Sequence, residues 1–376
     1  MRFQITDKHY KYIFVILLIP ILFIGFYNGV IIEGSSQDVQ YFPSKLLLKN
    51  IDYYNSYLNG DPWFLSQVPN YYFQLHFLLS PLTILTWIQF KIFWYVLNIT
   101  LILIIFFDLN KRFSVSFKKL TLYLLPFFFG FPMTNTLGNG QFGIIVISLI
   151  YFSWIYKEKY FSLSFILFLL LSKYSFGLPV LFGYFLMGYY RSVFTSILLT
   201  LIFPLLYSII FDLNFLSSIF LPLKVASIVT NIGPSDIMSF TRSIISNPNI
   251  QLLTIIFYNL LFVLIFVYYK IQKKILKIQI LLCSIVFSFI GFFHLGYDWV
   301  VLILILFFLN DGVLKNIFYG LIFINFSLPR FLKIIDNDIV FEIFKSPLYI
   351  FINLTLLSIL FFKILNESYP KKTLLN

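Results

Sequence analysis

Charged residues are scarce in this chain of 376 residues: 11% carry a charge, whereas 60% are hydrophobic. Soluble globular domains carry about 25% charged residues, so that class is excluded. The single cysteine, Cys283, excludes an internal disulfide. The chain has only three histidines, and its sequence contains no zinc signature, Walker sequence or nucleotide-binding glycine motif. We therefore predict no cofactor, no metal site and no nucleotide as fuel.

The sequence contains several apolar runs that are long enough to span a membrane. Runs of about 20 apolar residues recur, and each can cross a bilayer core of roughly 30 Å. The first, Tyr12–Ile32, has no charged residue and no signal-peptide cleavage motif after it, so we expect a retained span. We predict an all-α polytopic membrane protein, a single integral domain over residues 1–376. Its twelve or so transmembrane helices are expected at about 12–32, 89–109, 119–135, 141–156, 160–172, 174–190, 193–212, 250–269, 278–293, 299–314, 316–329 and 346–364.

Basic residues give the chain a net charge of +12, which by itself would suit a nucleic-acid partner. The positions of these residues favour membrane topology, and not a nucleic-acid partner, as the cause of the positive charge. Of the 27 basic residues, 18 fall in segments assigned to the cytoplasmic side, against five of the 15 acids. This bias is the positive-inside rule of membrane proteins. We expect both chain ends in the cytoplasm, contacts with membrane lipids, and no nucleic-acid partner.

Three longer segments are predicted on the outer side, at residues 33–88, 214–249 and 328–345. In the first of them, Gln74–Trp87 is apolar but only 14 residues long, and it contains Pro81. That length and that proline favour an interfacial helix over a crossing. The short spans within 160–190 leave open whether they form two full crossings or a re-entrant pair.

A polar, aromatic-rich stretch, Glu33–Tyr72, follows the first predicted span. It holds Asp38, six residues after the last apolar residue of the span. One interpretation makes Asp38 a general base at the outer mouth of a membrane cavity, taking the proton of an attacking hydroxyl. The other makes it the N-cap of a helix through Val39–Asn50, a position that favours aspartate. The local sequence leaves both open.

Two further polar features interrupt apolar runs. The first is the turn Gly138–Gln141, where two glycines permit a tight bend and the amides and backbone N–H groups could meet an anion or a sugar. The second is Lys173, which would cost about 3 kcal/mol or more at the bilayer centre. Lys173 is predicted on the same side as Asp38, where it could hold a phosphate or instead snorkel to the interface.

Polar residues near later helix ends complete the candidates. His294 and Asp298 lie at a predicted outer helix end, but with three histidines in the chain a metal site there is weakly indicated. Arg242 is the lone cation in the polar run 233–249. Its forked donors suit a phosphate, and a solvated surface position is the alternative.

Several short motifs occur in one order along the chain. They are Asp38-Val39-Gln40-Tyr41, Ser80-Pro81-Leu82-Thr83-Ile84-Leu85, the span containing Asn98, Asn139-Gly140-Gln141, Ser172-Lys173-Tyr174 and Tyr297-Asp298-Trp299. Over roughly residues 10–310 this order resembles the GT-C superfamily of glycosyltransferases. Within it, the chain is similar to the polyprenyl-phosphate-mannose-dependent α-mannosyltransferases, glycosyltransferase family 87.

This resemblance implies a GT-C-like helix arrangement and a first outer loop with interfacial helices. It also implies an enzyme of the bacterial plasma membrane that moves a hexose, with mannose the expected sugar. The sugar passes with inversion from a polyprenyl-phosphate donor to a lipid or glycan hydroxyl on the extracytoplasmic side.

The resemblance also assigns roles to residues. By it, Asp38 is the catalytic base, and Lys173 and Gln141 meet the donor phosphate. The resemblance also implies a substrate role for Asp298. We add Tyr41, His294 and Arg242 as substrate-binding candidates, with Arg242 as a phosphate clamp. The chain departs from the family pattern at Tyr174-Ser175-Phe176, where a proline-containing run is common, and at Trp299, where histidine is frequent. Both departures bear on the donor more than on the reaction class.

The chemistry is consistent with one carboxylate. A glycosidase needs two, because its leaving oxygen must be protonated, whereas a sugar phosphate leaves as a stabilised anion. Two other functions stay open. A transporter or flippase of a lipid-linked saccharide would use the same polar residues as a passage. A surface-glycan polymerase or ligase would depend on Arg242 and Arg330 more than on Asp38.

Overall fold

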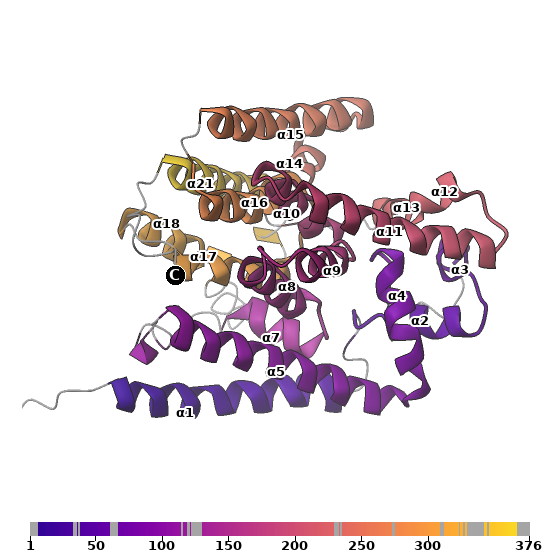
Figure 1. Cartoon of the computed structure of the whole chain (residues 1–376), viewed down its shortest axis with the longest axis horizontal. Helices are drawn as coiled ribbons and strands as arrows, with labels where there is room; N and C mark the ends of the chain where they lie inside the picture. Colours follow the sequence, from indigo (N-terminus) through magenta and orange to yellow (C-terminus); the bar gives the residue numbers. More distant parts are fainter. Residues whose placement is uncertain are drawn as a thin grey trace, which may run out of the picture. The chain divides into compact units, whose positions relative to one another are not determined.

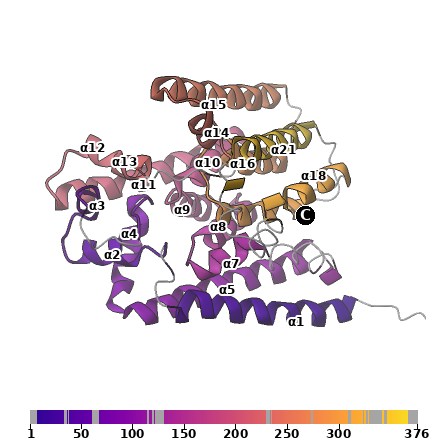
Figure 2. The same cartoon turned by 180° about the vertical axis from the view of Figure 1, so that it is seen from behind.

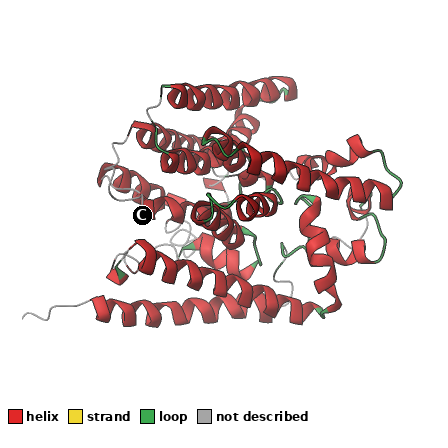
Figure 3. Cartoon of the chain, viewed as in Figure 1, coloured by secondary structure: helices red, strands yellow, loops and turns green. Residues whose placement is uncertain are grey.

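The structure is a computed structural model of the whole chain. It describes residues 7–32, 36, 38–60, 67–113, 116–118, 121, 130–228, 233, 235–272, 275–308, 312–322, 324–325, 328, 342–343 and 346–366. Every regular element in these ranges is a helix, and none of these residues forms a strand (Figure 3). The all-α prediction is therefore confirmed for the described part of the chain.

Five described helices are long and apolar enough to cross a membrane: His9–Ile31, Trp87–Arg112, Tyr190–Ile210, Pro248–Ile271 and Pro347–Asn366. A sixth crossing results if the bent pair Pro132–Gly138 and Gly143–Ile155, which meet at 106°, is one broken span. Such helices are those of an integral membrane protein. The other predicted spans correspond to shorter apolar helices or, as with most of 119–135, lie outside the described residues.

The chain divides into two compact units, residues 1–178 with 190–231, and residues 179–189 with 232–376. Figure 1 labels the α-helices. The helices of unit 1 are α1 (Asp7–Phe26), η1 (Tyr27–Ile31), α2 (Tyr41–Leu48), α3 (Tyr53–Leu58), α4 (Phe73–Leu79), η3 (Ser80–Ile84), α5 (Trp87–Phe113), α7 (Phe131–Gly138), α8 (Gly143–Ile155), α9 (Tyr160–Leu170), α11 (Tyr190–Ile210), α12 (Phe215–Ile219) and α13 (Leu221–Ile228). Helix α10 (Tyr174–Leu186) begins in unit 1 and ends in unit 2. Unit 2 further holds α14 (Ile237–Ile244), α15 (Pro248–Ile271), α16 (Lys277–Gly291), η4 (Gly296–Leu302), α17 (Ile303–Phe308), α18 (Gly312–Ile322) and α21 (Pro347–Asn366).

In unit 1, α1 and α5 lie side by side and antiparallel (Figures 1 and 2). The rings of Phe14 and Phe106 are 5.8 Å apart at one end, and those of Phe26 and Tyr95 are 5.5 Å apart at the other. The Tyr95 hydroxyl donates to the carbonyl of Leu22. These aromatic contacts fix the register of the first two long helices.

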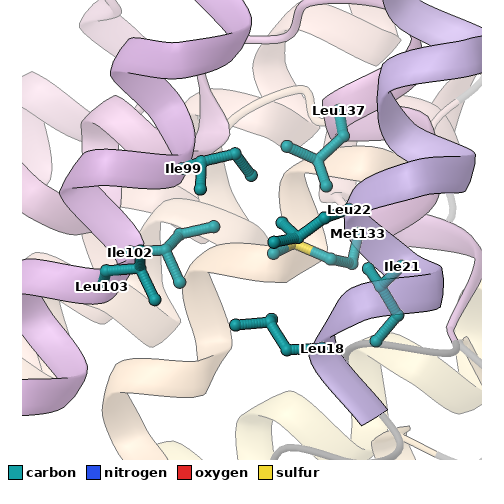
Figure 4. Close-up of a pocket in the computed structure, with 8 residues that line it drawn as sticks. All are labelled: Leu18, Ile21, Leu22, Ile99, Ile102, Leu103, Met133 and Leu137. Atoms are coloured by element: carbon teal, nitrogen blue, oxygen red, sulfur yellow. The ribbon is translucent and has the colours of Figure 1, made fainter. Parts of the chain in front are cut away.

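A narrow apolar crevice lies among α1, α5 and α7 (Figure 4). Eight aliphatic and methionine side chains line it: Leu18, Ile21, Leu22, Ile99, Ile102, Leu103, Met133 and Leu137. Close packing beside it depends on glycine, because a Cβ at Gly29 would lie 2.5 Å from the Leu137 carbonyl oxygen. The end of α7 is thereby held against the end of the first long helix.

The polar stretch after α1 folds into short helices around aromatic residues. A buried cluster joins α2, α3 and α4 to α11 and α13 through Leu46, Leu47, Tyr53, Tyr54, Phe73, Tyr207, Leu221 and Val225. The predicted interfacial helix 74–87 is formed by α4 and η3, and the pair is too short to count among the candidate spans. Asp52 caps α3 by accepting the Asn55 N–H at 3.0 Å, and the Tyr207 hydroxyl also donates to it.

In unit 2, α16 is almost wholly buried and packs against α15 and α21. The amide of Gln279 donates to the Ile364 carbonyl at 2.6 Å, and the rings of Phe262 and Phe287 are 6.0 Å apart. A second polar contact joins Asn325 and Asn353, whose amides exchange hydrogen bonds of 2.8 and 3.2 Å. Paired amides of this kind satisfy polar groups inside an apolar bundle.

Candidate active site

Asp38 lies after the first long helix, in a segment without regular structure, and is partly exposed. The N-cap interpretation is wrong: α2 begins at Tyr41, and its N-cap is Gln40, which makes no side-chain capping bond. Gln40 has φ +63°, a left-handed conformation. Asp38 therefore lies two residues before the N-cap position, and its carboxylate makes contacts other than a helix cap.

Two neutral donors hold the Asp38 carboxylate. The Tyr71 hydroxyl donates to Oδ2 at 2.8 Å, and Nε2 of Gln40 donates to Oδ1 at 3.3 Å. Hydrogen bonds to charged groups are about twice as strong as neutral ones. Tyr71 is 33 residues away along the chain, so a long-range contact fixes the orientation of the carboxylate.

Lys173 approaches the same tyrosine. Its Nζ lies 5.6 Å from the centre of the Tyr71 ring and 5.8 Å from that of Phe176, within the range of cation–π attraction. Only 9% of Lys173 is exposed, which favours a held ammonium group over one solvated at the interface. One side chain, Tyr71, therefore connects the predicted base and the predicted phosphate-binding cation.

Lys173 is positioned by the turn between α9 and α10. The backbone N–H of Tyr72 donates to the Ser172 carbonyl at 2.9 Å, which ties this turn to the segment that carries Tyr71. A Cβ at Gly177 would lie 2.7 Å from the Leu170 carbonyl oxygen, so the start of α10 folds back closely on α9. With 11 and 13 residues, α9 and α10 are both shorter than the candidate spans.

The turn Gly138–Gln141 meets the Asp38 segment through its carbonyl groups. The N–H of Ser36 donates to Gly138 at 3.3 Å, and that of Asp38 donates to Asn139 at 3.1 Å. The tight turn is confirmed by φ +63° at Gly140. A Cβ there would lie 2.0 Å from Cγ2 of Val39, so only glycine fits without rearrangement.

The predicted use of this turn's backbone N–H groups for an anion is wrong at two positions. The N–H groups of Asn139 and Gln141 donate to the carbonyls of Asn135 and Thr136, at 2.7 and 2.9 Å. They therefore complete the end of α7 instead of facing a ligand. The Gln141 side chain, buried at the turn, remains the part that can act on a substrate.

Aromatic residues fix the turn from the other side. Nε1 of Trp94 on α5 donates to the Gly140 carbonyl at 2.8 Å. The ring of Phe142 lies 5.4 Å from Tyr71 and 5.9 Å from Trp94. The turn, Tyr71 and α5 are thereby joined in one packed group.

Tyr41 lies near Asp38 in sequence, but its hydroxyl is hydrogen-bonded to another part of the chain. It is buried, and its hydroxyl donates to the carbonyls of Leu85 and Thr83 at 2.8 and 3.4 Å. Lys45 donates to the same hydroxyl at 3.3 Å. In this geometry Tyr41 anchors α2 to the turn before α5, and its role in binding substrate stays a prediction.

The remaining predicted residues lie in unit 2. Nδ1 of His294 is 3.1 Å from Oδ2 of Asp298, and both side chains are buried. Arg242 stands on α14, partly exposed. Arg330 lies outside the described residues. No three His, Cys, Asp or Glu side chains within the described ranges gather closely enough to hold a metal ion.

A second buried acid, Asp236, accompanies the His294–Asp298 pair. It caps α14 by accepting the N–H and Oγ–H of Ser239, at 2.7 and 2.8 Å. The His294 backbone also hydrogen-bonds to it, and a Cβ at Gly233 would lie 2.3 Å from the His294 carbonyl. Burial raises the pKa of Asp236 to about 6, against the lowering effect of these hydrogen bonds.

Sequence reasoning did not single out Tyr71 or Asp236. Nothing local marks Tyr71, because it is one of 26 tyrosines and its partner is 33 residues distant. Asp236 had a readable signal, since Asp followed three residues later by Ser fits an N-cap before an apolar run. Comparisons of the chain with protein-family models, curated proteins and solved structures find no match.

Proposed function

We propose that this chain is a membrane glycosyltransferase that moves a hexose from a polyprenyl-phosphate donor to an acceptor hydroxyl. The observation that carries the proposal is the arrangement around Tyr71, whose hydroxyl bonds Asp38 and whose ring lies under the Lys173 ammonium group. One side chain thus holds a carboxylate, which can take the proton of the acceptor hydroxyl, and a cation, which can offset the negative charge of the leaving phosphate.

In the proposed reaction, Asp38 takes the proton of the acceptor hydroxyl as its oxygen attacks the anomeric carbon. The bond between that carbon and the phosphate oxygen breaks, and its electron pair leaves with the polyprenyl phosphate. Lys173 lies where it can offset the negative charge that grows on the phosphate. Attack opposite the leaving group inverts the anomeric centre.

The base and the cation of this site each have a known effect on reaction rates. A positioned base contributes about 10²–10⁴-fold, and a fixed cation acts strongly on developing charge in a water-poor site. Tyr71 and Gln40 keep the carboxylate oriented before substrate arrives, so little reorganisation is needed. The proposal places this site on the extracytoplasmic side within about twelve spans, and mannose is the first sugar to test.

The direct test incubates the purified full chain in lipid nanodiscs with polyprenyl phosphates carrying different radiolabelled hexoses and a membrane lipid extract. A labelled product with an inverted anomeric centre, formed without added nucleotide, supports the proposal. Labelled donor that crosses the bilayer unchanged, with no product from any sugar, would replace the transferase with a transporter.

A further inference from the structure

Three side-chain amides near Asp38 have a buried oxygen atom that accepts no hydrogen bond from the described residues. They belong to Gln40, Asn70 and Gln141. A buried acceptor left without a donor costs about 1–3 kcal/mol, and native structures hold few of them. All three stand on segments that meet around Asp38 and Tyr71, and a ligand that supplies donors would satisfy them.

The orientation of the Gln40 amide is fixed by its own contacts. Its Nε2 donates to Oδ1 of Asp38 at 3.3 Å and to the Val68 carbonyl at 3.0 Å. Turning the amide over would set its oxygen against a carboxylate and a carbonyl oxygen. Oε1 is therefore the atom left over, and it is an acceptor.

The other two amides belong to the segments that surround Tyr71. Asn70 directly precedes Tyr71, whose hydroxyl donates to Asp38. Gln141 directly precedes Phe142, whose ring is 5.4 Å from Tyr71. The backbone of the same turn accepts the Asp38 N–H at Asn139. The three acceptors and the carboxylate thus belong to one connected group.

The chemistry of this group selects its ligand. Amide oxygens and a carboxylate take hydrogen-bond donors, so a phosphate, which brings acceptors and negative charge, is disfavoured beside them. The cation of the site, Lys173, lies over the Tyr71 ring and suits the phosphate there. A neutral sugar offers one donor for each of its hydroxyls.

We propose that Gln40, Asn70 and Gln141 form a subsite for a neutral, hydroxyl-rich sugar. Resting on the proposed transferase, this makes the acceptor a glycan or glycolipid headgroup and not a simple lipid alcohol. The anionic part of the donor and the polyol of the acceptor then lie at different parts of the Tyr71 side chain.

The test measures binding of radiolabelled octyl glucoside, below its micellar concentration, and of 1-octanol to the full chain in nanodiscs. Without donor present, we expect the glucoside to bind at least tenfold more tightly than octanol. Gln141→Leu and Gln40→Asn should each weaken glucoside binding about tenfold, as loss of one hydrogen bond does, and leave octanol unchanged. Asparagine is chosen at position 40 because it tolerates the left-handed backbone.

Gln74→Leu is the matched control. Gln74 is also buried, donates to one carbonyl, that of Phe168 at 3.1 Å, and has an oxygen without a donor in the described structure. Its amide is held by the Phe168 carbonyl of α9 and belongs neither to the Asp38 segment nor to the Gly138–Gln141 turn, so glucoside binding should not change. Equal binding of both probes by the native chain, or equal losses in Gln74→Leu and Gln141→Leu, overturns the subsite.

The possible results distinguish failure of the sugar subsite from failure of the proposed transferase function. Selective glucoside binding with no sugar transfer from any donor removes the proposed function and keeps the sugar subsite. Transfer to octanol as fast as to octyl glucoside keeps the transferase and removes the subsite. The comparison of the two probes on the native chain stands even if a variant fails to fold.

Discussion

Two polar groups, one in each unit, differ in how far apart in the sequence their bonded side chains lie. Around Asp38, the side-chain bond to Tyr71 spans 33 residues, and Lys173 comes from another helix pair. Around His294, the side-chain bond to Asp298 spans four residues. Asp236 likewise accepts from Ser239, three residues on, and its contact with the distant His294 is made by the His294 backbone and not by a side chain.

The difference teaches which group is assembled for chemistry. A bond of three or four residues' span is what helix capping and turn formation produce by themselves. A carboxylate and a cation brought to one tyrosine from distant segments need the whole unit to fold first. We therefore expect changes in the Asp38 group to affect activity, and changes in the Asp236 group to affect stability.

The largest effect is expected from Asp38→Asn. This change keeps the size and the bond from Tyr71 but removes the base, so transfer should fall about 10²–10⁴-fold with donor binding retained. Initial rates and donor affinity of the purified variant measure this. Asp212→Asn, at an exposed aspartate of unit 1, serves as the control and should transfer normally. Normal transfer by Asp38→Asn would remove Asp38 from the mechanism.

Next comes Lys173→Gln, which removes the cation over Tyr71. Loss of a fixed charge beside a developing anion is expected to lower transfer about 10²–10³-fold and to weaken donor binding as well. A titration of rate against donor concentration separates the two effects. Lys224→Gln, at an exposed lysine of α13, should change neither. If both lysine variants behave alike, Lys173 does not serve the donor phosphate.

A smaller loss is expected from Tyr71→Phe. The ring under Lys173 stays, while the hydroxyl that orients Asp38 goes. A hydrogen bond to a charged group is worth about 1.5–3 kcal/mol, so the rate should fall about 10- to 100-fold at unchanged donor affinity. Tyr57→Phe, at a partly exposed tyrosine of α3, is the control. A loss of donor affinity with the rate constant intact would show that Tyr71 serves the phosphate instead.

The smallest expected effect is a pH dependence of stability caused by Asp236. This residue lies outside every candidate span, and burial raises its pKa to about 6. The folded chain then binds a proton that the unfolded chain has released between about pH 4 and 6. Stability from this group is therefore lost as the pH rises through that window, by about 2–3 kcal/mol, and stays constant above it. Asp236→Asn keeps an N-cap and should remove that slope.

Thermal unfolding of both proteins in nanodiscs between pH 4 and 7 measures the difference. Groups other than Asp236 are common to both proteins, so the difference between the two curves reports on Asp236. Parallel curves for the native chain and Asp236→Asn would show that Asp236 is not held protonated. Unchanged transfer activity in this variant is expected, because the described partners of Asp236, Ser239 and the His294 backbone, are not part of the Asp38 group.

Much of the fold was predictable because hydrocarbon imposes a simple rule. A segment such as Pro248–Ile271 must satisfy its backbone internally wherever it meets lipid, so its apolar length alone predicts a helix. The short apolar segment with Pro81 forms helices below the length of a candidate span, but so do the predicted spans at 160–172, 174–190 and 278–293. The count of twelve crossings stays a prediction, since five to six described helices meet the length and composition needed.

The amino-acid sequence by itself determined the helical membrane class, the tight turn at Gly140 and the scarcity of polar groups that made Asp38 and Lys173 candidates. Only the tertiary structure decided that Gln40 and not Asp38 occupies the N-cap position of α2, and that Tyr71 joins the acid to the lysine. The reason is physical. Helix formation and turns depend on neighbours in the chain, whereas side chains tens of residues apart meet only where the packing of whole helices brings them together.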